Sequence, residues 1–204
     1  MRIYKTDEIK ELANVAKEGK IIAFPTETVF GLGAISSSKD AFKKLVEVKK
    51  RPPDKPFTLM CSNTKQIEKY ADFAGLFKKI AEIFAPGPIT FIVKSKEFLP
   101  SYLTLDTGWI GIRIPDDKNV LNLINEVGEP LLVPSANISG EPPAMSTEEI
   151  ISIFDGKIDG VLEGTCVSGK PSTIIKIDGD NIILIREGEL KLSTILEAVK
   201  WKFH

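Results

Sequence analysis

Residues 21–57 contain the feature that most constrains the fold of this chain, a buried strand that opens directly into a polar turn. Ile21–Phe24 is a short apolar run that predicts a buried strand. Pro25 ends the run, because proline has no N–H for a strand ladder. Thr26–Gly33 then contains two hydroxyl side chains and two glycines within eight residues. Hydroxyl groups and glycine-exposed backbone N–H groups at the end of a strand suit a small polar ligand.

A helix and a cationic loop follow this turn. Ser38 is an N-cap type of residue, and the expected helix carries its apolar side chains at positions 41, 42, 45, 46 and 48. It leads into Lys49–Pro56, where four cations stand among three prolines. Lysine-rich loops are ordinarily only solvated, but proline fixes φ and lowers the entropy lost when charges gather on an anion. The Lys49–Lys55 segment therefore predicts a phosphate-binding loop, with a merely solvated loop as the alternative.

Length and composition are typical of a globular protein. The 204 residues carry a formal net charge of −1, so a nucleic-acid partner would need a local basic patch. No apolar run approaches the ~20 residues of a membrane helix, and the first residues lack the apolar core of a signal peptide. Cys61 and Cys166 form no CxxC pair and are expected to be free thiols. We predict one domain over residues 1–204, located in the cytoplasm, without a membrane partner.

The histidine count narrows the possible chemistry. The sequence has one histidine, the last residue His204, where chain ends usually fray. Ser-His-Asp and Cys-His catalysis need an internal imidazole, and two cysteines cannot form a Cys₄ zinc site. We therefore expect no protein-held metal, and catalysis by positioning and charge.

Helical and strand patterns alternate along the chain. The expected helices cover about residues 6–18, 38–48, 64–70, 73–84, 117–127, 147–154 and 193–199. The expected strands cover about residues 21–24, 57–61, 89–93, 109–114, 131–133, 161–162, 172–177 and 182–186. Asp178–Asn181 reads as a hairpin turn, and residues 94–108 have no assignable pattern. This order predicts an α/β fold, bordering on α+β, with a twisted mixed sheet, flanking helices and an open ligand-binding cleft.

Gly164–Lys170 imitates a phosphate-binding P-loop. It fits seven positions of that motif, but Pro171 stands where Ser or Thr should bind Mg²⁺. A strand is expected to follow, whereas a P-loop must open a helix whose N–H groups cradle phosphate. We therefore reject this interpretation.

Ligand-type side chains gather at five other places. They are Thr26 with Thr28, the Lys49–Lys55 segment, Ser135 with Asn137, Arg113, and Ser172 with Thr173 and Arg186. Each alone is weak, because loop hydroxyls and amides often only cap turns and an arginine often forms a structural ion pair. Together they describe a cleft for an anionic ligand with several polar groups.

The same positions carry a resemblance to the YrdC/TsaC family of threonylcarbamoyl-AMP synthases, over nearly the whole chain. The matching segments are Pro25–Leu32, Lys49-x-Arg51-Pro52, Gly111–Pro115, Pro134–Gly140, Pro171–Ile174 and Arg186–Gly188. The resemblance implies a YrdC-like fold, in the short form without a further C-terminal domain. It also implies the synthesis of threonylcarbamoyl-AMP and pyrophosphate from L-threonine, bicarbonate and ATP, by a nucleotidyltransferase that serves a tRNA modification.

The resemblance also implies site residues, cofactors and partners. The ATP contacts are expected at Arg51, Lys55, Asn137 and Arg186, and Lys49 and Arg51 are the expected catalytic pair. The L-threonine contacts are expected at Thr28, Arg113, Ser135 and Ser172. Mg²⁺ is expected with ATP. Threonylcarbamoyl-transferring proteins are the expected downstream partners, and tRNA is expected to bind weakly or indirectly.

Departures and rival functions stay open at this point. Phe30 stands where the family more often has Tyr, Met60 where many relatives have His, and Trp109 where a small hydroxyl residue is common. Pro143–Met145 replaces a Ser-Pro-Thr run that approaches the nucleotide. One alternative function is an RNA-binding module that uses the Lys49–Lys55 loop. The other is a relative of this fold that handles carbamoyl-adenylate.

Overall fold

The computed structural model describes residues 1–52 and 54–203, with side chains as far as residue 200. Pro53 of the predicted loop and His204 lie outside the described residues. The strands are β1 Arg2–Tyr4, β2 Ile22–Phe24, β3 Gly31–Ile35, β4 Thr58–Met60, β5 Ile89–Lys94, β6 Trp109–Arg113, β7 Leu131–Leu132, β8 Gly160–Leu162, β9 Thr173–Asp178 and β10 Asn181–Arg186. The helices are α1 Ile9–Lys17, α2 Lys39–Lys49, α3 Thr64–Ile67, α4 Gly75–Phe84, α5 Ser101–Thr104, α6 Lys118–Val127, α7 Thr147–Phe154 and α8 Leu192–Phe203. A 3₁₀ turn over Thr6–Glu8 precedes α1.

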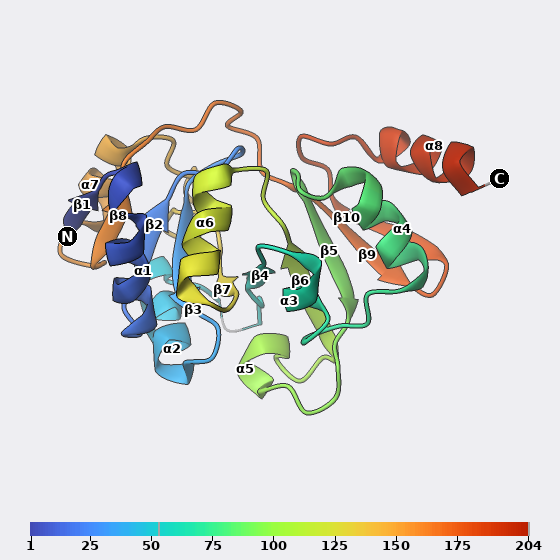
Figure 1. The fold of residues 1–204 in the computed structure, drawn as a ribbon, viewed down its shortest axis with the longest axis horizontal. Coiled ribbons are helices and arrows are strands. Elements are labelled where there is room, and N and C mark those ends of the chain that lie inside the picture. The colour runs from blue at the N-terminus through green and yellow to red at the C-terminus, as the bar shows by residue number, and fades with distance from the viewer. Residues whose placement is uncertain (53, 204) are drawn as a thin grey trace.

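The strands form one sheet in the order β1-β8-β2-β3-β7-β4-β6-β5-β9-β10. The pairs β1–β8, β2–β8, β4–β6 and β5–β9 are parallel, and the others are antiparallel. Figure 1 shows α1, α2 and α6 beside one end of this sheet and α4 and α8 beside the other, with the two termini at opposite ends of the molecule. The mixed sheet with flanking helices confirms the predicted α/β architecture. Treating residues 1–204 as one domain stays a proposal.

Local sequence signals place several elements correctly. The side chains of Ile9, Leu12, Ala13 and Ala16 form the buried face of α1, as their spacing predicts. The Ser38 hydroxyl accepts a hydrogen bond from the backbone N–H of Ala41 at 3.1 Å and so caps α2. The predicted hairpin joins β9 to β10, where Asn181 pairs with Asp178.

Other expectations are wrong in detail. The hydroxyl of Thr64 predicts that this residue caps α3, but Asn63 is the cap, since its side chain accepts from the N–H of Gln66 at 3.1 Å. The apolar pattern also predicts Leu121 on the buried face of α6 with Val120, Ile124 and Val127. Those three are buried, but Leu123 takes the place of Leu121, which is half-exposed. α8 begins at Leu192, which puts Ser193 inside the helix.

Three short elements escaped the sequence patterns. β1 and β3 are strands of three and five residues, and α5 has four, so each is too short for a periodicity to show. β3 passes through the two glycines of the polar turn and pairs with β2 in an antiparallel ladder. Gly33 faces Phe24 so closely that an added Cβ would lie 2.7 Å from its ring, which explains why β3 has a glycine at this position.

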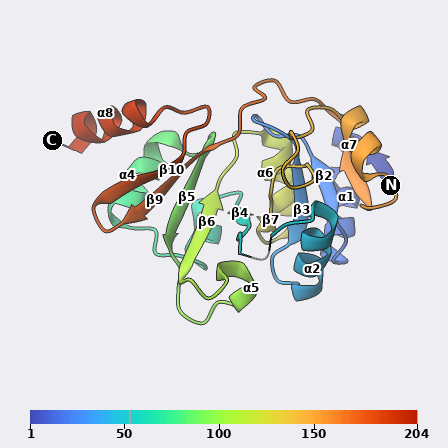
Figure 2. The same cartoon turned by 180° about the vertical axis from the view of Figure 1, so that it is seen from behind.

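The last residue of α2 corrects the predicted cationic loop. Lys49 lies in the helix and is buried, 3% exposed, so it is not one of the loop's solvated cations. Lys50 ends α2 in the left-handed region at φ 49°. In Figure 2 β4 lies at the middle of the sheet, between α1, α2 and α6 on one side and α4 and α8 on the other. No helix within residues 1–52 and 54–203 is long and apolar enough to cross a membrane.

Candidate functional site

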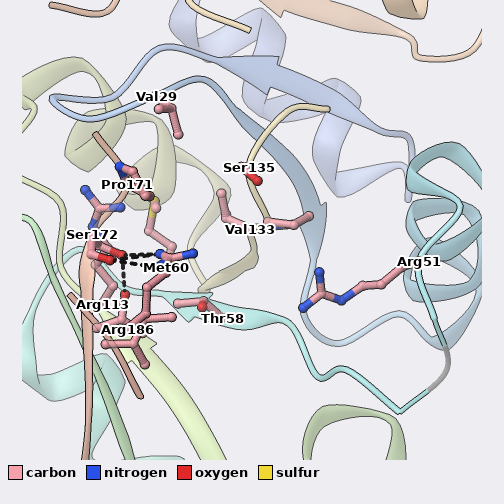
Figure 3. Close-up of a pocket in the computed structure, with 13 residues that line it drawn as sticks. Val29, Arg51, Thr58, Met60, Arg113, Val133, Ser135, Pro171, Ser172 and Arg186 are labelled. Atoms are coloured by element: carbon pink, nitrogen blue, oxygen red, sulfur yellow. Dashed lines mark hydrogen bonds between the residues drawn. The ribbon is translucent and has the colours of Figure 1, made fainter. Parts of the chain in front are cut away.

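A small cavity of about 140 Å³ lies over the middle of the sheet. Five strands line it, β4, β5, β6, β9 and β10, together with the loops that follow β2, α2 and β7 and the loop that precedes β9. The lining residues are Val29, Arg51, Thr58, Met60, Thr90, Arg113, Val133, Pro134, Ser135, Pro171, Ser172, Ile174 and Arg186. Figure 3 shows Arg51 reaching toward the cavity from the side opposite Ser172 and Arg186. Segments far apart in sequence therefore meet at one concave, strongly cationic place.

Arg113, at the end of β6, is held from behind by the turn after β2. It is 6% exposed, and its Nη2 donates to Glu27 Oε1 at 2.8 Å and to Thr28 Oγ1 at 3.0 Å. Thr28 is fully buried and does not line the cavity. The structure therefore places Thr28 against the Arg113 guanidinium, and its direct contact with a ligand stays a prediction.

Ser172 and Arg186 form the opposite wall. The Ser172 hydroxyl lies 2.9 Å from the Thr90 hydroxyl, and Arg186 donates to the Ser172 carbonyl from Nη2 at 2.8 Å and from Nε at 3.2 Å. Burial, and then the nearby charge of Arg113, lower the pKa of Arg186. Gly188 closes this wall, because a Cβ there would lie 2.0 Å from the carbonyl oxygen of Pro171. The Arg186–Gly188 segment thus needs glycine in order to pack on the chain that carries Ser172.

Lys49 lies beneath the loop that follows β7. Its Nζ donates to the carbonyl oxygen of Ser135 at 2.7 Å, to Asn137 Oδ1 at 2.7 Å and to the carbonyl oxygen of Asn137 at 3.2 Å. These contacts engage the three N–H bonds of the ammonium group. Burial, and then the charge of Arg51, lower the pKa of Lys49 to about 8. Lys49 therefore fixes the loop that presents Ser135 and Asn137.

The side chain of Asn137 is fully engaged. Oδ1 accepts from Lys49 and from the Ser135 hydroxyl, at 2.7 and 2.6 Å. Nδ2 donates to the carbonyl oxygens of Ile138 and Glu141, at 2.9 and 2.7 Å. A contact from this side chain to ATP stays a prediction, and it would require one of these bonds to be exchanged.

Two further cavities adjoin the small one on the side of the Lys49–Lys55 loop. One, of about 530 Å³, shares Arg51, Thr58, Thr90, Ile174 and Arg186 with it. The other, of about 400 Å³, is lined by Lys49, Arg51, Pro52, Lys55, Ser135, Asn137, Ser139 and Gly140. Arg51 lines all three cavities, and Lys55 lines both of the larger ones. The predicted ATP residues therefore line adjoining cavities that share Arg51.

Arg51 is braced within its own loop. Nε donates to the carbonyl oxygen of Lys55 and Nη2 to that of Pro56, each at 2.7 Å, and the guanidinium lies 4.7 Å from the centroid of the Phe57 ring. Burial lowers the pKa of Arg51. The loop is thus ordered around Arg51, while Lys50 and Lys55 are its exposed cations.

The departures from the family pattern fall at different distances from the cavities. Met60 is 2% exposed and lines the small cavity, where a thioether offers only a weak acceptor. Trp109 lines the larger cavity, and the Nζ of Lys176 lies 3.6 Å from its ring centroid. Pro143–Met145 lines a separate depression, and Phe30 is fully buried in the core.

Thr58, Thr90 and Glu27 are polar residues at the site that the sequence patterns missed, and Thr58 lines both the small cavity and the 530 Å³ cavity. Thr90 is buried and bonds to Ser172, and it was the one hydroxyl in an otherwise apolar predicted strand. Glu27 stood between the two threonines that were singled out, but nothing in the sequence indicated its pairing with Arg113, 86 positions away.

The false P-loop behaves as expected. The backbone N–H of Gly169 donates to the carbonyl oxygen of Thr28 at 3.1 Å, and the chain enters β9 at Thr173 without forming a helix. Within the described residues no three or more His, Cys, Asp or Glu side chains are grouped so that they could hold a metal ion.

Comparison with known proteins gives consistent matches. The model of the Sua5, YciO and YrdC family, described as "Telomere recombination", matches residues 14–188. The threonylcarbamoyl-AMP synthase of Bacillus subtilis is 36% identical over 97% of this chain, which spans 58% of that protein. The threonylcarbamoyl-AMP synthase of Vibrio parahaemolyticus is 33% identical over 89% of this chain and is covered completely.

A solved structure has the same fold over almost the whole chain. The crystal structure of Pyrococcus abyssi Sua5 in complex with L-threonine superposes with a TM-score of 0.93 at 32% identity. The match covers 98% of this chain and 61% of the Pyrococcus chain. The chain therefore spans little more than half of the longer relatives and the whole of a shorter one.

Proposed function

The chain belongs to the family of Sua5, YciO and YrdC proteins, and on that premise we propose that it is a threonylcarbamoyl-AMP synthase. The substrates are L-threonine, bicarbonate and ATP, and the second product is pyrophosphate. The observation that carries the proposal is the small cavity with a buried arginine and four hydroxyl side chains in its wall, which shares Arg51 with two larger cationic cavities. Relatives with this reaction in their name align over most of the chain.

L-threonine occupies the small cavity in this proposal. Its carboxylate is a match for the Arg113 guanidinium, since arginine binds carboxylates through charge-assisted hydrogen bonds. The hydroxyls of Ser135 and Ser172 face the same space and are the partners for its polar groups. Met60 and Val133 give the cavity apolar wall for the methyl group. The size of the cavity, about 140 Å³, suits a small amino acid.

ATP occupies the two larger cavities, with its phosphates toward Arg51. Arg51, Lys55 and Arg186 supply positive charge around this space from two separate parts of the chain. Phosphoryl and adenylyl transfer depend mainly on positioning and on screening of the phosphate charge, which such side chains provide. Lys49 acts from below, by holding the loop that carries Ser135 and Asn137.

The chemistry needs no nucleophile from the protein. The lone pair of the threonine amine attacks the carbon of bicarbonate, and loss of water leaves a carbamate. A carbamate oxygen then attacks the α-phosphorus of ATP, and the bond from that phosphorus to the oxygen bridging the β-phosphate breaks to release pyrophosphate. The arginines hold the carbamate and the α-phosphate in line and stabilise the charge that develops. An enclosed cavity also protects the mixed anhydride product from water.

Magnesium enters this proposal with the nucleotide. Asp54 is the one carboxylate among the described residues that line the three cavities. Mg²⁺ commonly binds through one or two carboxylates and substrate phosphates, so this inventory fits an ion held mostly by ATP. The product would pass to threonylcarbamoyl-transferring proteins that modify tRNA, and the cytoplasm is the compartment this implies.

The decisive experiment measures pyrophosphate release with each substrate omitted in turn. We expect release only when L-threonine, bicarbonate and ATP are all present. Release that is equally fast without threonine would contradict the proposal and favour a relative that handles carbamoyl-adenylate. Equal release without bicarbonate would contradict the carbamate step.

A further inference from the structure

The ion pair between Arg113 and Glu27 joins a buried guanidinium to a part-buried carboxylate, and each side chain keeps one enclosed atom without a partner in the described part of the chain. The two side chains are 8% and 19% exposed. Glu27 Oε1 accepts from Arg113 Nη2 at 2.8 Å and from the backbone N–H of Asp116 at 3.1 Å. Glu27 Oε2 and Arg113 Nε are enclosed and have no hydrogen-bond partner among the described residues. The ion pair therefore contains one hydrogen-bond donor, Arg113 Nε, and one acceptor, Glu27 Oε2, that have no partner within residues 1–52 and 54–203.

The neighbouring threonines fix which way the protons point. Thr26 Oγ1 donates its single proton to the carbonyl oxygen of Val29 at 2.7 Å. In the 2.9 Å contact between the two hydroxyls, Thr28 must therefore be the donor. The oxygen of Thr28 is then an acceptor toward Arg113 Nη2, at 3.0 Å. Both hydrogens of Nη2 are thus engaged, one by Glu27 and one by Thr28.

The donors left to Arg113 are Nε and Nη1. Nη1 makes no hydrogen bond to any described residue and, unlike Nε, is not enclosed, while Arg113 lines the small cavity. A buried donor or acceptor without a partner costs about 1–3 kcal/mol, so such atoms are uncommon unless a ligand or water completes them. Anchoring Nη2 behind the cavity wall leaves Nη1 for an anionic ligand, while Nε stays enclosed.

We propose that Glu27 is a positioning residue for amino-acid binding, because it anchors Nη2 of Arg113 and so presents Nη1 to the substrate carboxylate. The inference rests on the proposed function, in which that carboxylate belongs to L-threonine. Glu27 acts through Arg113, since it does not itself line the cavity. Its bond to the N–H of Asp116 also ties the guanidinium to the start of the segment that leads into α6.

The carboxylate has a second effect, on the charge of the site. Arg113 and Arg186 lie close enough for the charge of Arg113 to disfavour that of Arg186. Glu27 balances the charge of Arg113 from the side away from the cavity. Loss of the Glu27 charge therefore alters both the direction and the electrostatic surroundings of the guanidinium, whereas loss of an exposed carboxylate elsewhere does neither.

The test is the variant Glu27→Gln, which keeps the shape and an oxygen acceptor but removes the charge. We expect the KM for L-threonine to rise about tenfold, as for the loss of one charge-assisted hydrogen bond, while the KM for ATP changes less than about twofold. The preference for L-threonine over L-threoninol, which lacks the carboxylate, should fall by a similar factor in binding measured by calorimetry. Glu27→Asp should restore part of the preference.

The control is Glu129→Gln, in which the altered carboxylate accepts from the N–H and hydroxyl of Ser37 away from the cavities. This control should leave both KM values unchanged. If Glu27→Gln binds threonine and threoninol as wild type does, or raises both KM values equally, the positioning role is overturned while the proposed function stands. If the wild-type protein itself binds no L-threonine, the proposed function fails and the inference fails with it.

Discussion

Two arginines of the site are held in opposite ways. Arg113 is positioned by Glu27 and Thr28, which lie 86 and 85 residues away in the sequence. Arg51 is positioned by the carbonyl oxygens of Lys55 and Pro56, four and five residues away. The contacts of Arg113 therefore form only when distant segments of the chain have come together, whereas those of Arg51 form within its own loop. Damage to the first should affect stability and ligand binding together, and damage to the second should affect binding alone.

The largest expected effect is at Arg113. Arg113→Met leaves the part-buried Glu27 with only a backbone partner. Loss of one member of a fully buried pair costs about 3–5 kcal/mol of the free energy of unfolding, and we expect a loss near the lower end of this range. Threonine binding should be lost as well. Chemical denaturation and calorimetry measure the two losses. The double variant Arg113→Met/Glu27→Gln should recover stability but not threonine binding. Recovery of neither would contradict the view that the unpaired Glu27 charge causes the loss of stability.

A milder change at the same position separates the substrates. Arg113→Lys keeps the charge but cannot reproduce the planar donor set of the guanidinium. The KM for threonine should therefore rise much more than the KM for ATP. An equal rise in both would show that Arg113 supports a wall shared by the two ligands.

Arg51 should give a smaller loss, confined to the nucleotide. Arg51→Ala or Lys55→Ala should weaken ATP use by about 2–4 kcal/mol, the order expected for a partly desolvated contact to phosphate. The free energy of unfolding should change by less than about 1 kcal/mol, since the loop contributes little to the core. Wild-type turnover in a folded Arg51→Ala/Lys55→Ala variant would show that the loop is merely solvated.

The lowered pKa of Lys49 predicts that the stability of the protein depends on pH. This pKa of about 8 in the folded protein lies below the ordinary value of 10.5, so the unfolded chain binds more protons between these values. The free energy of unfolding should therefore gain up to about 3 kcal/mol from this residue as the pH rises from 8 to 10.5. Lys49→Met should lack this gain. Parallel denaturation curves at pH 8 and pH 10 decide the point, and equal pH dependence in the two proteins would contradict it.

The smallest expected effect is at Arg186, which shares features of both regions. It lines the small cavity and the larger one, and it donates twice to the Ser172 carbonyl. Arg186→Lys should raise the KM for ATP about tenfold and the KM for threonine less, because one ammonium replaces a two-point contact. Calorimetry with threonine and with a non-hydrolysable ATP analogue measures each separately. Equal loss of both ligands would place Arg186 with Arg113 as part of the assembled wall.

Local patterns in the sequence determined much of the fold. The buried face of α1, the cap of α2 and the hairpin between β9 and β10 each depend on residues within a few positions of one another, and each is as predicted. The P-loop motif could also be rejected from the sequence alone, because Pro171 and the strand that follows it do not fit the motif. The family resemblance came from the order of short motifs along the chain, and the comparisons confirm it.

The tertiary structure alone decided how the site residues are used. Lys49 counted as a loop cation in the sequence, but it ends α2 and binds the Ser135–Asn137 segment. Glu27 and Thr90 carried no sequence signal for their partners, since β2, β5 and β6 bring those partners from distant positions. The physical reason is that hydrophobic periodicity and capping report interactions along the chain, whereas burial, proton direction and pKa depend on groups that meet only when the sheet has formed.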